Sequence, residues 1–189
     1  ALSGSLVLSV DAMGGDHGPS VVVPGVRSYI REHGGEGVRF LLHGDETRIS
    51  AELARCGLTA DTCEIRHTDK VVAMDEKPAQ AMRRGKGSSL WNAIEAVKAG
   101  EAGGVVSAGN TGALMALSML RLRKLPGVNR PAIACLWPTV RGESVVLDVG
   151  ATIDDFPVGR DPATGSHDHD VSELQLGRGN RDDVLALDL

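Results

Sequence analysis

Short apolar runs alternate with segments of helical periodicity along the first 150 residues, and this alternation restricts the possible fold more than any other feature. Residues 6–10 form the first run, and glycines lie on both sides of it, which predicts a buried strand that leads into a loop. The other runs predict strands at residues 38–43, 62–67, 71–73, 104–107, 132–136 and 144–149. The strand at 71–73 is expected to be a short edge strand.

The segments between these runs space their apolar side chains three and four residues apart, as amphipathic helices do. Asp45 suits the N-cap of one such helix, and Gly57 suits its C-cap. The helix that begins at Thr111 is apolar on almost every side in its first half, which is typical of a helix buried within a domain. Helices are therefore predicted at residues 19–32, 45–55, 88–99 and 111–124.

Strands that alternate with helices indicate an α/β fold with a doubly wound, largely parallel sheet. We expect residues 1–150 to form the N-terminal part of such a domain, with ligands beyond the carboxyl ends of the strands. Residues 151–189 carry nine acidic and three basic side chains, a net charge of −6, whereas the first 150 residues carry +1. We interpret residues 151–189 as an irregular acidic tail, disordered or read in a shifted frame, so that the α/β domain is incomplete.

Composition disfavours two classes of ligand. A net charge of −5 and an aromatic content of 3% argue against nucleic acid, which calls for a basic surface with stacking side chains. The three cysteines, Cys56, Cys63 and Cys135, have no metal-ligand spacing, so we expect reduced structural thiols and no metal site.

The first candidate site is the glycine-rich turn after the first strand. Gly14 and Gly15 let the backbone approach a ligand and present N–H groups at the start of the following helix, which suits an anion. Asp16 could orient the backbone or a catalytic group, and His17 is a candidate acid–base or phosphate-donor residue. The alternative is a tight turn with no role beyond connecting a strand to a helix.

The second candidate site is a basic cluster that precedes a predicted helix. Its four cations are Lys77, Arg83, Arg84 and Lys86, and two hydroxyls, those of Ser88 and Ser89, follow them. A phosphate there would accept charge-assisted hydrogen bonds and interact favourably with the helix dipole. A solvated basic surface is the alternative.

The third candidate site is the turn between the strand at 104–107 and the apolar helix after it. Burying the start of a helix leaves several N–H groups without partners. Asn110 and Thr111 can cap some of these groups, and an anion bound near Gly109 and Gly112 could satisfy the rest. Capping alone is the alternative.

Taken together, these segments resemble the bacterial phosphate acyltransferases of phospholipid synthesis. The resemblance rests on residues 10–19, Lys77-Pro78, Arg83, 86–89, 107–115, 130–132 and 146–151. It implies a fold similar to isocitrate dehydrogenase and phosphotransacetylase, without metal or nucleotide. It also implies a cytoplasmic homodimer that moves a fatty acyl group from acyl-carrier protein to inorganic phosphate. The homodimer would associate peripherally with the membrane through a glycerol-3-phosphate acyltransferase partner.

The resemblance assigns candidate roles by position. Asn110, Thr111 and His17 are candidate catalytic residues. The candidate phosphate- and substrate-binding residues are Gly14, Gly15, Asp16, Lys77, Arg83, Lys86, Ser88, Ser89, Gly109 and Gly112. Two alternatives stay open, namely a phosphotransacetylase-like transfer from a small acyl-coenzyme A and an inactive truncated fragment.

Overall fold

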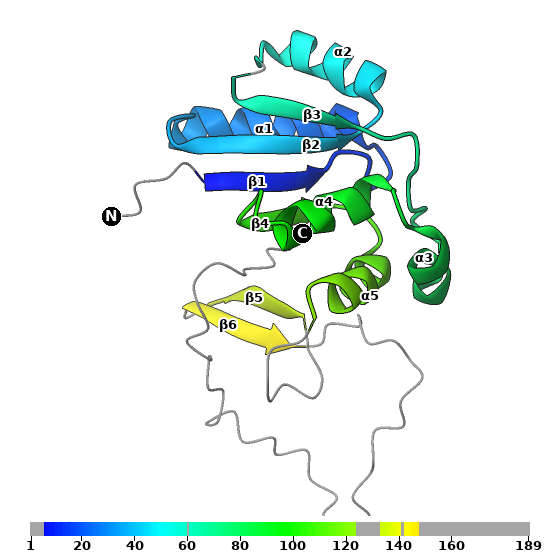
Figure 1. The fold of residues 1–189 in the computed structure, drawn as a ribbon. Coiled ribbons are helices and arrows are strands. Elements are labelled where there is room, and N and C mark those ends of the chain that lie inside the picture. The colour runs from blue at the N-terminus through cyan, green and yellow to red at the C-terminus, as the bar shows by residue number, and fades with distance from the viewer. Residues whose placement is uncertain (1–5, 60, 124–132, 141, 148–189) are drawn as a thin grey trace, which may run out of the picture.

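The computed structural model describes residues 6–59, 61–123, 133–140 and 142–147. Its strands are β1 (Leu6–Asp11), β2 (Val38–Gly44), β3 (Cys63–His67), β4 (Gly104–Ser107), β5 (Ala134–Thr139) and β6 (Gly142–Leu147). Its helices are α1 (Pro19–His33), α2 (Glu46–Cys56), α3 (Pro78–Arg84), α4 (Ser89–Lys98) and α5 (Thr111–Arg121). Figure 1 shows their arrangement. Both predicted caps of α2 are confirmed, because Asp45 accepts a hydrogen bond from the Arg48 N–H and Gly57 adopts a left-handed conformation.

Strands β1 to β4 form a parallel sheet in the order β3-β2-β1-β4. The two faces carry different helices: α1 lies behind the sheet and α4 in front of it in Figure 1. Val10, Phe40 and Leu42 belong to the core shared with α1 and α2. Leu41 faces the other way and packs with Ala96 of α4. Helices on both faces of a parallel sheet confirm the predicted doubly wound α/β fold.

Helix α5 packs against α3 and α4. Leu114 and Leu117 are almost fully buried, which confirms the expectation of a buried helix. Helix α3 is missing from the predicted elements because its seven residues include two arginines and little apolar periodicity. Its one buried residue, Ala81, joins the core formed with α4 and α5.

Two expectations about strands need correction. Residues 71–73 do not form an edge strand; Val72 turns its side chain into the core near Leu90, and the Ala73 carbonyl accepts a side-chain hydrogen bond instead. The strands expected at 132–136 and 144–149 are present as β5 and β6, but they do not join the parallel sheet: they pair antiparallel with each other, in a sheet separate from β1 to β4. The acidic segment 151–189 lies outside the described residues, so its interpretation as a disordered or frame-shifted tail stays a prediction.

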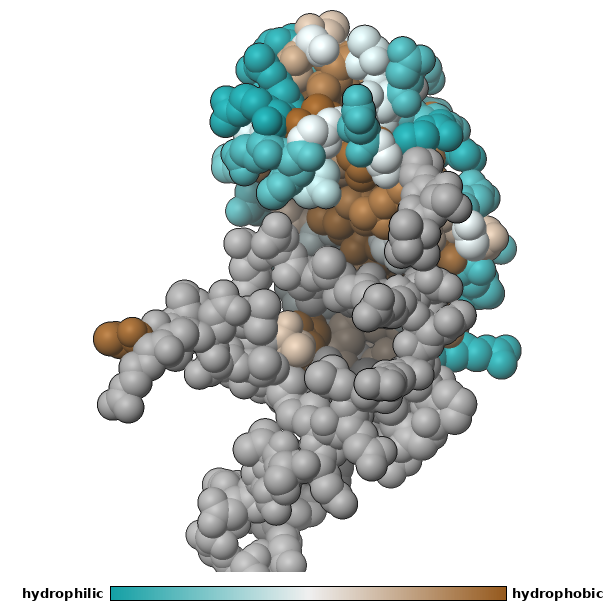
Figure 2. Space-filling model, turned by 90° about the vertical axis from the view of Figure 1, so that its left-hand side faces the viewer, coloured by the Kyte–Doolittle hydropathy of each residue, from teal (hydrophilic) through white to brown (hydrophobic). Residues whose placement is uncertain are grey.

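Apolar surface appears on the side where the parallel strands begin. Viewed from that side, brown side chains reach the surface between the polar upper part of the molecule and the atoms drawn in grey (Figure 2). Leu6, at the start of β1, leaves 47% of its surface exposed. Among the described helices, none has the length and apolar character needed to cross a bilayer.

Candidate functional site

The carboxyl ends of β1 and β4 form the point from which the sheet winds in opposite directions. The chain leaves β1 for α1 on one face and reaches β4 from α4 on the other. Ligands of open α/β sheets bind at such a switch point. Asp11 and Ser107 end the two strands and lie side by side in the parallel register. The first and third glycine-containing turns predicted from sequence therefore meet at this edge.

The two turns approach each other so closely that side chains are excluded between them. A Cβ placed on Gly14 would lie 2.8 Å from the Gly109 nitrogen and 2.8 Å from Asp11 Oδ2. Gly15 has φ +81°, and a Cβ there would lie 3.1 Å from the Ala108 carbonyl oxygen. Glycine is required at both positions, for space at the first and for backbone conformation at the second.

Asp11 is buried between these turns, with 3% of its surface exposed. Its Oδ2 accepts a hydrogen bond of 2.8 Å from the Ser107 hydroxyl, and its Oδ1 accepts one of 3.3 Å from the Met13 N–H. Burial raises the pKa of the Asp11 carboxyl, and the Ser89 and Ser107 hydroxyls oppose that shift only in part. The carboxyl is thus shielded from solvent and surrounded by hydrogen-bond donors.

Asn110 connects the turn after β4 to the segment that follows β3. Its Oδ1 accepts a hydrogen bond of 2.9 Å from the Ala113 N–H and so caps α5. Its Nδ2 lies 3.2, 2.9 and 2.8 Å from the carbonyl oxygens of Ala73, Met74 and Glu76. The whole amide is committed to the protein, which favours the capping alternative for this residue. Thr111, beside it, is exposed at the start of α5.

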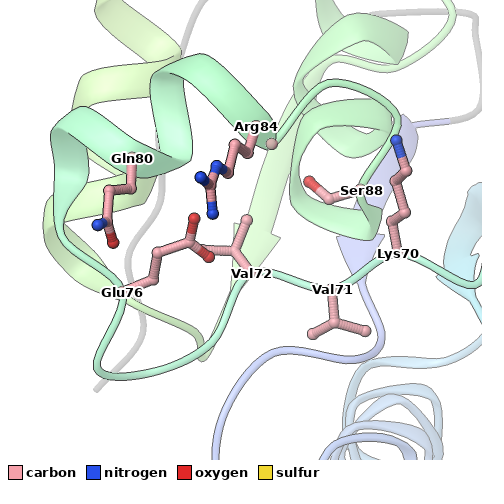
Figure 3. Close-up of a pocket in the computed structure, with 8 residues that line it drawn as sticks. Lys70, Val71, Val72, Glu76, Gln80, Arg84 and Ser88 are labelled. Carbon is pink, nitrogen blue, oxygen red and sulfur yellow. The ribbon is translucent and has the colours of Figure 1, made fainter.

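A pocket of about 400 Å³ opens beside this segment. It lies between the loop after β3, helix α3 and the start of α4, and Figure 3 shows Glu76 and Arg84 pointing toward one another across it. Its lining residues are Lys70, Val71, Val72, Glu76, Gln80, Arg84, Gly85 and Ser88. Two cations and one carboxylate at the start of a helix give the pocket an excess of positive charge that suits an anionic group.

The predicted basic cluster is divided by the fold. Of its four cations, Arg84 lines the pocket, whereas Lys77, Arg83 and Lys86 are exposed and do not line it. The second cation of the pocket is Lys70. The Lys70 ammonium donates a hydrogen bond of 3.3 Å to the Lys86 carbonyl. Lys70 lay outside the predicted cluster because it is seven residues upstream, with no glycine or cation beside it in sequence.

The two serines after the cluster have different surroundings. Ser88 caps α4, since its hydroxyl accepts a hydrogen bond of 3.2 Å from the Trp91 N–H. Ser89 is fully buried, and its hydroxyl has no hydrogen-bond partner within the described part of the chain. In the first turn, Asp16 and His17 are exposed, whereas Gly112 packs against Pro78 of α3.

A buried polar pair on β1 and β2 escaped the sequence analysis. The Ser9 hydroxyl lies 2.9 Å from His43 Nε2, and both residues are at least 96% buried. Burial, and to a lesser extent the charge of Arg66, lowers the pKa of His43 to about 4. Each residue is a polar side chain within an otherwise apolar run of a strand, and this sequence feature could have predicted the buried pair.

Comparison with known proteins identifies a family and several relatives that this chain resembles. The model of a family described as "Fatty acid synthesis protein" matches residues 6–158. A phosphate acyltransferase from Caulobacter vibrioides is 60% identical over 153 residues, which are 81% of this chain and 42% of that protein. A phosphate acyltransferase from Rhodospirillum rubrum is 59% identical over 150 residues, 79% of this chain and 42% of that protein. The chain thus spans about two fifths of the length of these relatives.

Among solved structures, a phosphotransacetylase from Streptococcus pyogenes superimposes with a TM-score of 0.50 at 14% sequence identity. The match covers 75% of this chain and 46% of that one. At this level of identity the likeness concerns the fold alone, and it agrees with the phosphotransacetylase-like architecture expected from sequence.

Proposed function

Because this chain belongs to the fatty acid synthesis protein family, we propose that it supplies part of an enzyme that transfers an acyl group to phosphate. The observation that carries the proposal is its 60% identity over 153 residues to a protein named phosphate acyltransferase. The family model matches residues 6–158, which contain all three candidate sites. The meeting of two glycine-containing turns at the switch point of the sheet supports it, since this is where such a fold holds a ligand.

The reaction is a substitution at a thioester. A phosphate oxygen attacks the carbonyl carbon, the new C–O bond forms, and the C–S bond breaks so that the thiolate leaves with its electron pair. An enzyme accelerates this step by holding the two substrates in line and by placing N–H donors where the oxyanion develops. The N–H groups of Gly14 and Gly109 are bonded to Asp11 and Ser107. The other N–H groups of the Gly14–Gly15 and Gly109–Gly112 turns, with the Thr111 hydroxyl at the start of α5, would provide such donors. Asn110 would act by holding that turn in place.

The finer assignments rest on the family resemblance. We propose acyl-carrier protein as the acyl donor and a membrane glycerol-3-phosphate acyltransferase as the consumer of the acyl phosphate. The enzyme would act as a cytoplasmic homodimer that reaches the membrane through that partner. His17 and Asp16, both exposed in the turn after β1, are proposed to contact substrate.

A chimera tests the proposal directly. Residues 6–147 of this chain would replace the aligned segment of the Caulobacter vibrioides relative, which is 60% identical to it. Acyl phosphate would be trapped with hydroxylamine, and thiol release would be followed with and without inorganic phosphate. We expect phosphate-dependent release from acyl-carrier protein thioesters and much slower release from a short acyl-coenzyme A. An inactive but folded chimera beside an active parent enzyme would refute the proposal.

A second measurement concerns the cationic side chains proposed to bind phosphate. In the chimera, Lys70→Ala and Arg84→Ala should each raise KM for phosphate roughly ten- to a hundredfold, because each removes a cation that lines the pocket and with it a charge-assisted contact. Lys98→Ala is the matched control, since Lys98 is exposed in the last turn of α4, at the end remote from the pocket. If KM for phosphate stays unchanged and only KM for the acyl donor rises, these cations bind the donor instead.

A further inference from the structure

The carboxylate of Asp11 joins the ends of β1 and β4. Its two oxygens bind different segments: Oδ1 accepts from Met13 in its own turn, and Oδ2 accepts from the Ser107 hydroxyl, 96 residues away in sequence. Ser107 Oγ in turn accepts a hydrogen bond of 3.0 Å from the Gly109 N–H. A continuous chain of hydrogen bonds therefore runs from one candidate turn to the other through a single buried carboxylate.

The spacing of the two turns depends on this carboxylate. A Cβ on Gly109 would lie 3.3 Å from Asp11 Oδ2 and 3.3 Å from the Gly14 Cα, so the turns touch each other and the carboxylate at once. Close-packed groups of this kind have no room to shift independently. A change in the length or direction of the Asp11 hydrogen bonds therefore moves the Gly109 turn against the Gly14 turn.

A third element reaches the same group. Ser89, the first residue of α4, is fully buried and lies close enough to Asp11 to influence its carboxyl. Its hydroxyl has no hydrogen-bond partner within the described residues, so it is available to the carboxylate. A buried hydroxyl without a partner is costly, which favours an arrangement in which Asp11 serves β1, β4 and α4 together.

We propose that Asp11 is a positioning residue of the acyl-transfer site. Its carboxylate sets the separation of the Gly14–Gly15 turn from the Gly109–Gly112 turn, and through it the direction of the N–H groups that face the substrates. Asp11 is 3% exposed and acts through these turns. This inference rests on the proposed function, because it names how that site keeps its geometry.

The test compares three buried substitutions in the chimera. Asp11→Asn keeps the shape of the side chain but removes its charge, and Ser107→Ala removes the hydroxyl that joins the two turns. Ser9→Ala is the matched control, because Ser9 is equally buried on β1 and is bonded to His43 rather than to a turn. Steady-state kinetics, melting temperature and amide exchange at Gly109 would be measured for each.

We expect Asp11→Asn and Ser107→Ala to lower kcat roughly ten- to a hundredfold, as a small misplacement of catalytic groups does, with little change in KM. Amide exchange at Gly109 should become faster in both. Ser9→Ala should lower the melting temperature while leaving kcat and Gly109 exchange unchanged. Ser107→Ala is the smaller change and keeps the test valid should Asp11→Asn fail to fold.

Folded Asp11→Asn or Ser107→Ala proteins with the parental kcat would overturn the inference. A kcat loss in Ser9→Ala that matches the loss in Ser107→Ala would also overturn it, since any buried polar defect would then suffice. Failure of the proposed function is a separate result: the unsubstituted chimera would make no acyl phosphate. The Gly109 exchange rates would in that case still decide whether Asp11 sets the spacing of the turns.

Discussion

Glycines shape the candidate site because they have no side chain. Gly14 and Gly109 leave room for the Asp11 carboxylate between two turns that lie far apart in the sequence. On the same face of the sheet, Ser9 and His43 form a second buried polar pair. Burial raises the pKa of Cys63 to about 11, which fits the expectation of an inert structural thiol.

Gly14→Ala should destabilise the protein by about 1–3 kcal/mol, because its Cβ would lie 2.8 Å from backbone as well as from a buried carboxylate. Acyl transfer should fall with it. Gly25→Ala is the control: Gly25 lies within α1, and its Cβ would meet nothing within 4 Å. That substitution should be neutral or stabilise by about 0.5–1 kcal/mol. Chemical denaturation separates the two, and equal effects would contradict the crowding at Gly14.

His43 should make stability depend on pH below neutrality. Its pKa falls from 6.5 to about 4 on folding, so the neutral imidazole is favoured in the folded state. The resulting stabilisation is present above pH 6.5 and is lost as pH falls toward 4. A shift of this size corresponds to about 3 kcal/mol.

The measurement is the unfolding free energy between pH 7 and pH 4 for the protein and for His43→Asn. The pH dependence should be weaker in the variant, whereas His33→Asn, at an exposed position in the last turn of α1, should behave like the parent. Identical slopes in all three proteins would argue against a buried neutral His43.

At the level of elements, helix starts and the turns before them hold the site together. Helices α2, α4 and α5 each follow an N-cap residue whose side chain accepts a backbone hydrogen bond, namely Asp45, Ser88 and Asn110. Asn110 differs from the other two because its amide nitrogen also holds the loop that lines the pocket. One side chain thus joins the β4 turn, α5 and the pocket wall.

Asn110→Asp separates these two roles. The carboxylate can still accept from the Ala113 N–H, but it cannot donate to the carbonyls of residues 73, 74 and 76. We expect a loss of about 1–3 kcal/mol of stability, measured by chemical denaturation. Asp45→Asn, which exchanges two equally good caps at α2, should change stability by less than about 0.5 kcal/mol. A neutral Asn110→Asp would show that the loop is held by other contacts.

For the whole molecule, the described sheet ends at β4, which is the last strand in the order β3-β2-β1-β4 and carries Ser107 at its carboxyl end. One wall of the candidate site therefore lies at a sheet edge. The relatives are more than twice as long as the segment they share with this chain. We accordingly propose that the protein groups that complete the substrate site come from the part of the relatives that this segment does not match.

The 189-residue chain assayed by itself should form no acyl phosphate, whereas the chimera should. Both proteins contain the same candidate turns, so the comparison isolates the contribution of the remaining three fifths of the relative. Hydroxylamine trapping at equal protein concentration is the measurement, with circular dichroism to establish that both are folded. Acyl phosphate formation by the chain alone, within about tenfold of the chimera, would show that these turns suffice.

The sequence by itself determined the features that depend on neighbouring residues. Apolar periodicity located the strands and helices of the parallel sheet, and the caps at Asp45 and Gly57 followed from local backbone chemistry. The glycine-containing turns at 14–15 and 109–112 were recognised because glycine signals an unusual backbone wherever it stands. The short helix α3 was missed, because seven residues with two arginines carry too little periodicity.

Only the tertiary structure decided which of these features meet. The strand order places β1 beside β4, and this brings Ser107 onto Asp11 and Gly109 onto Gly14. The same fold lines the pocket with Arg84 from the predicted basic cluster and with Lys70 from outside it. The physical reason is that periodicity and capping act over a few residues, whereas the site is built by contacts between segments about a hundred residues apart. Those contacts follow from how helices cover the two faces of the sheet.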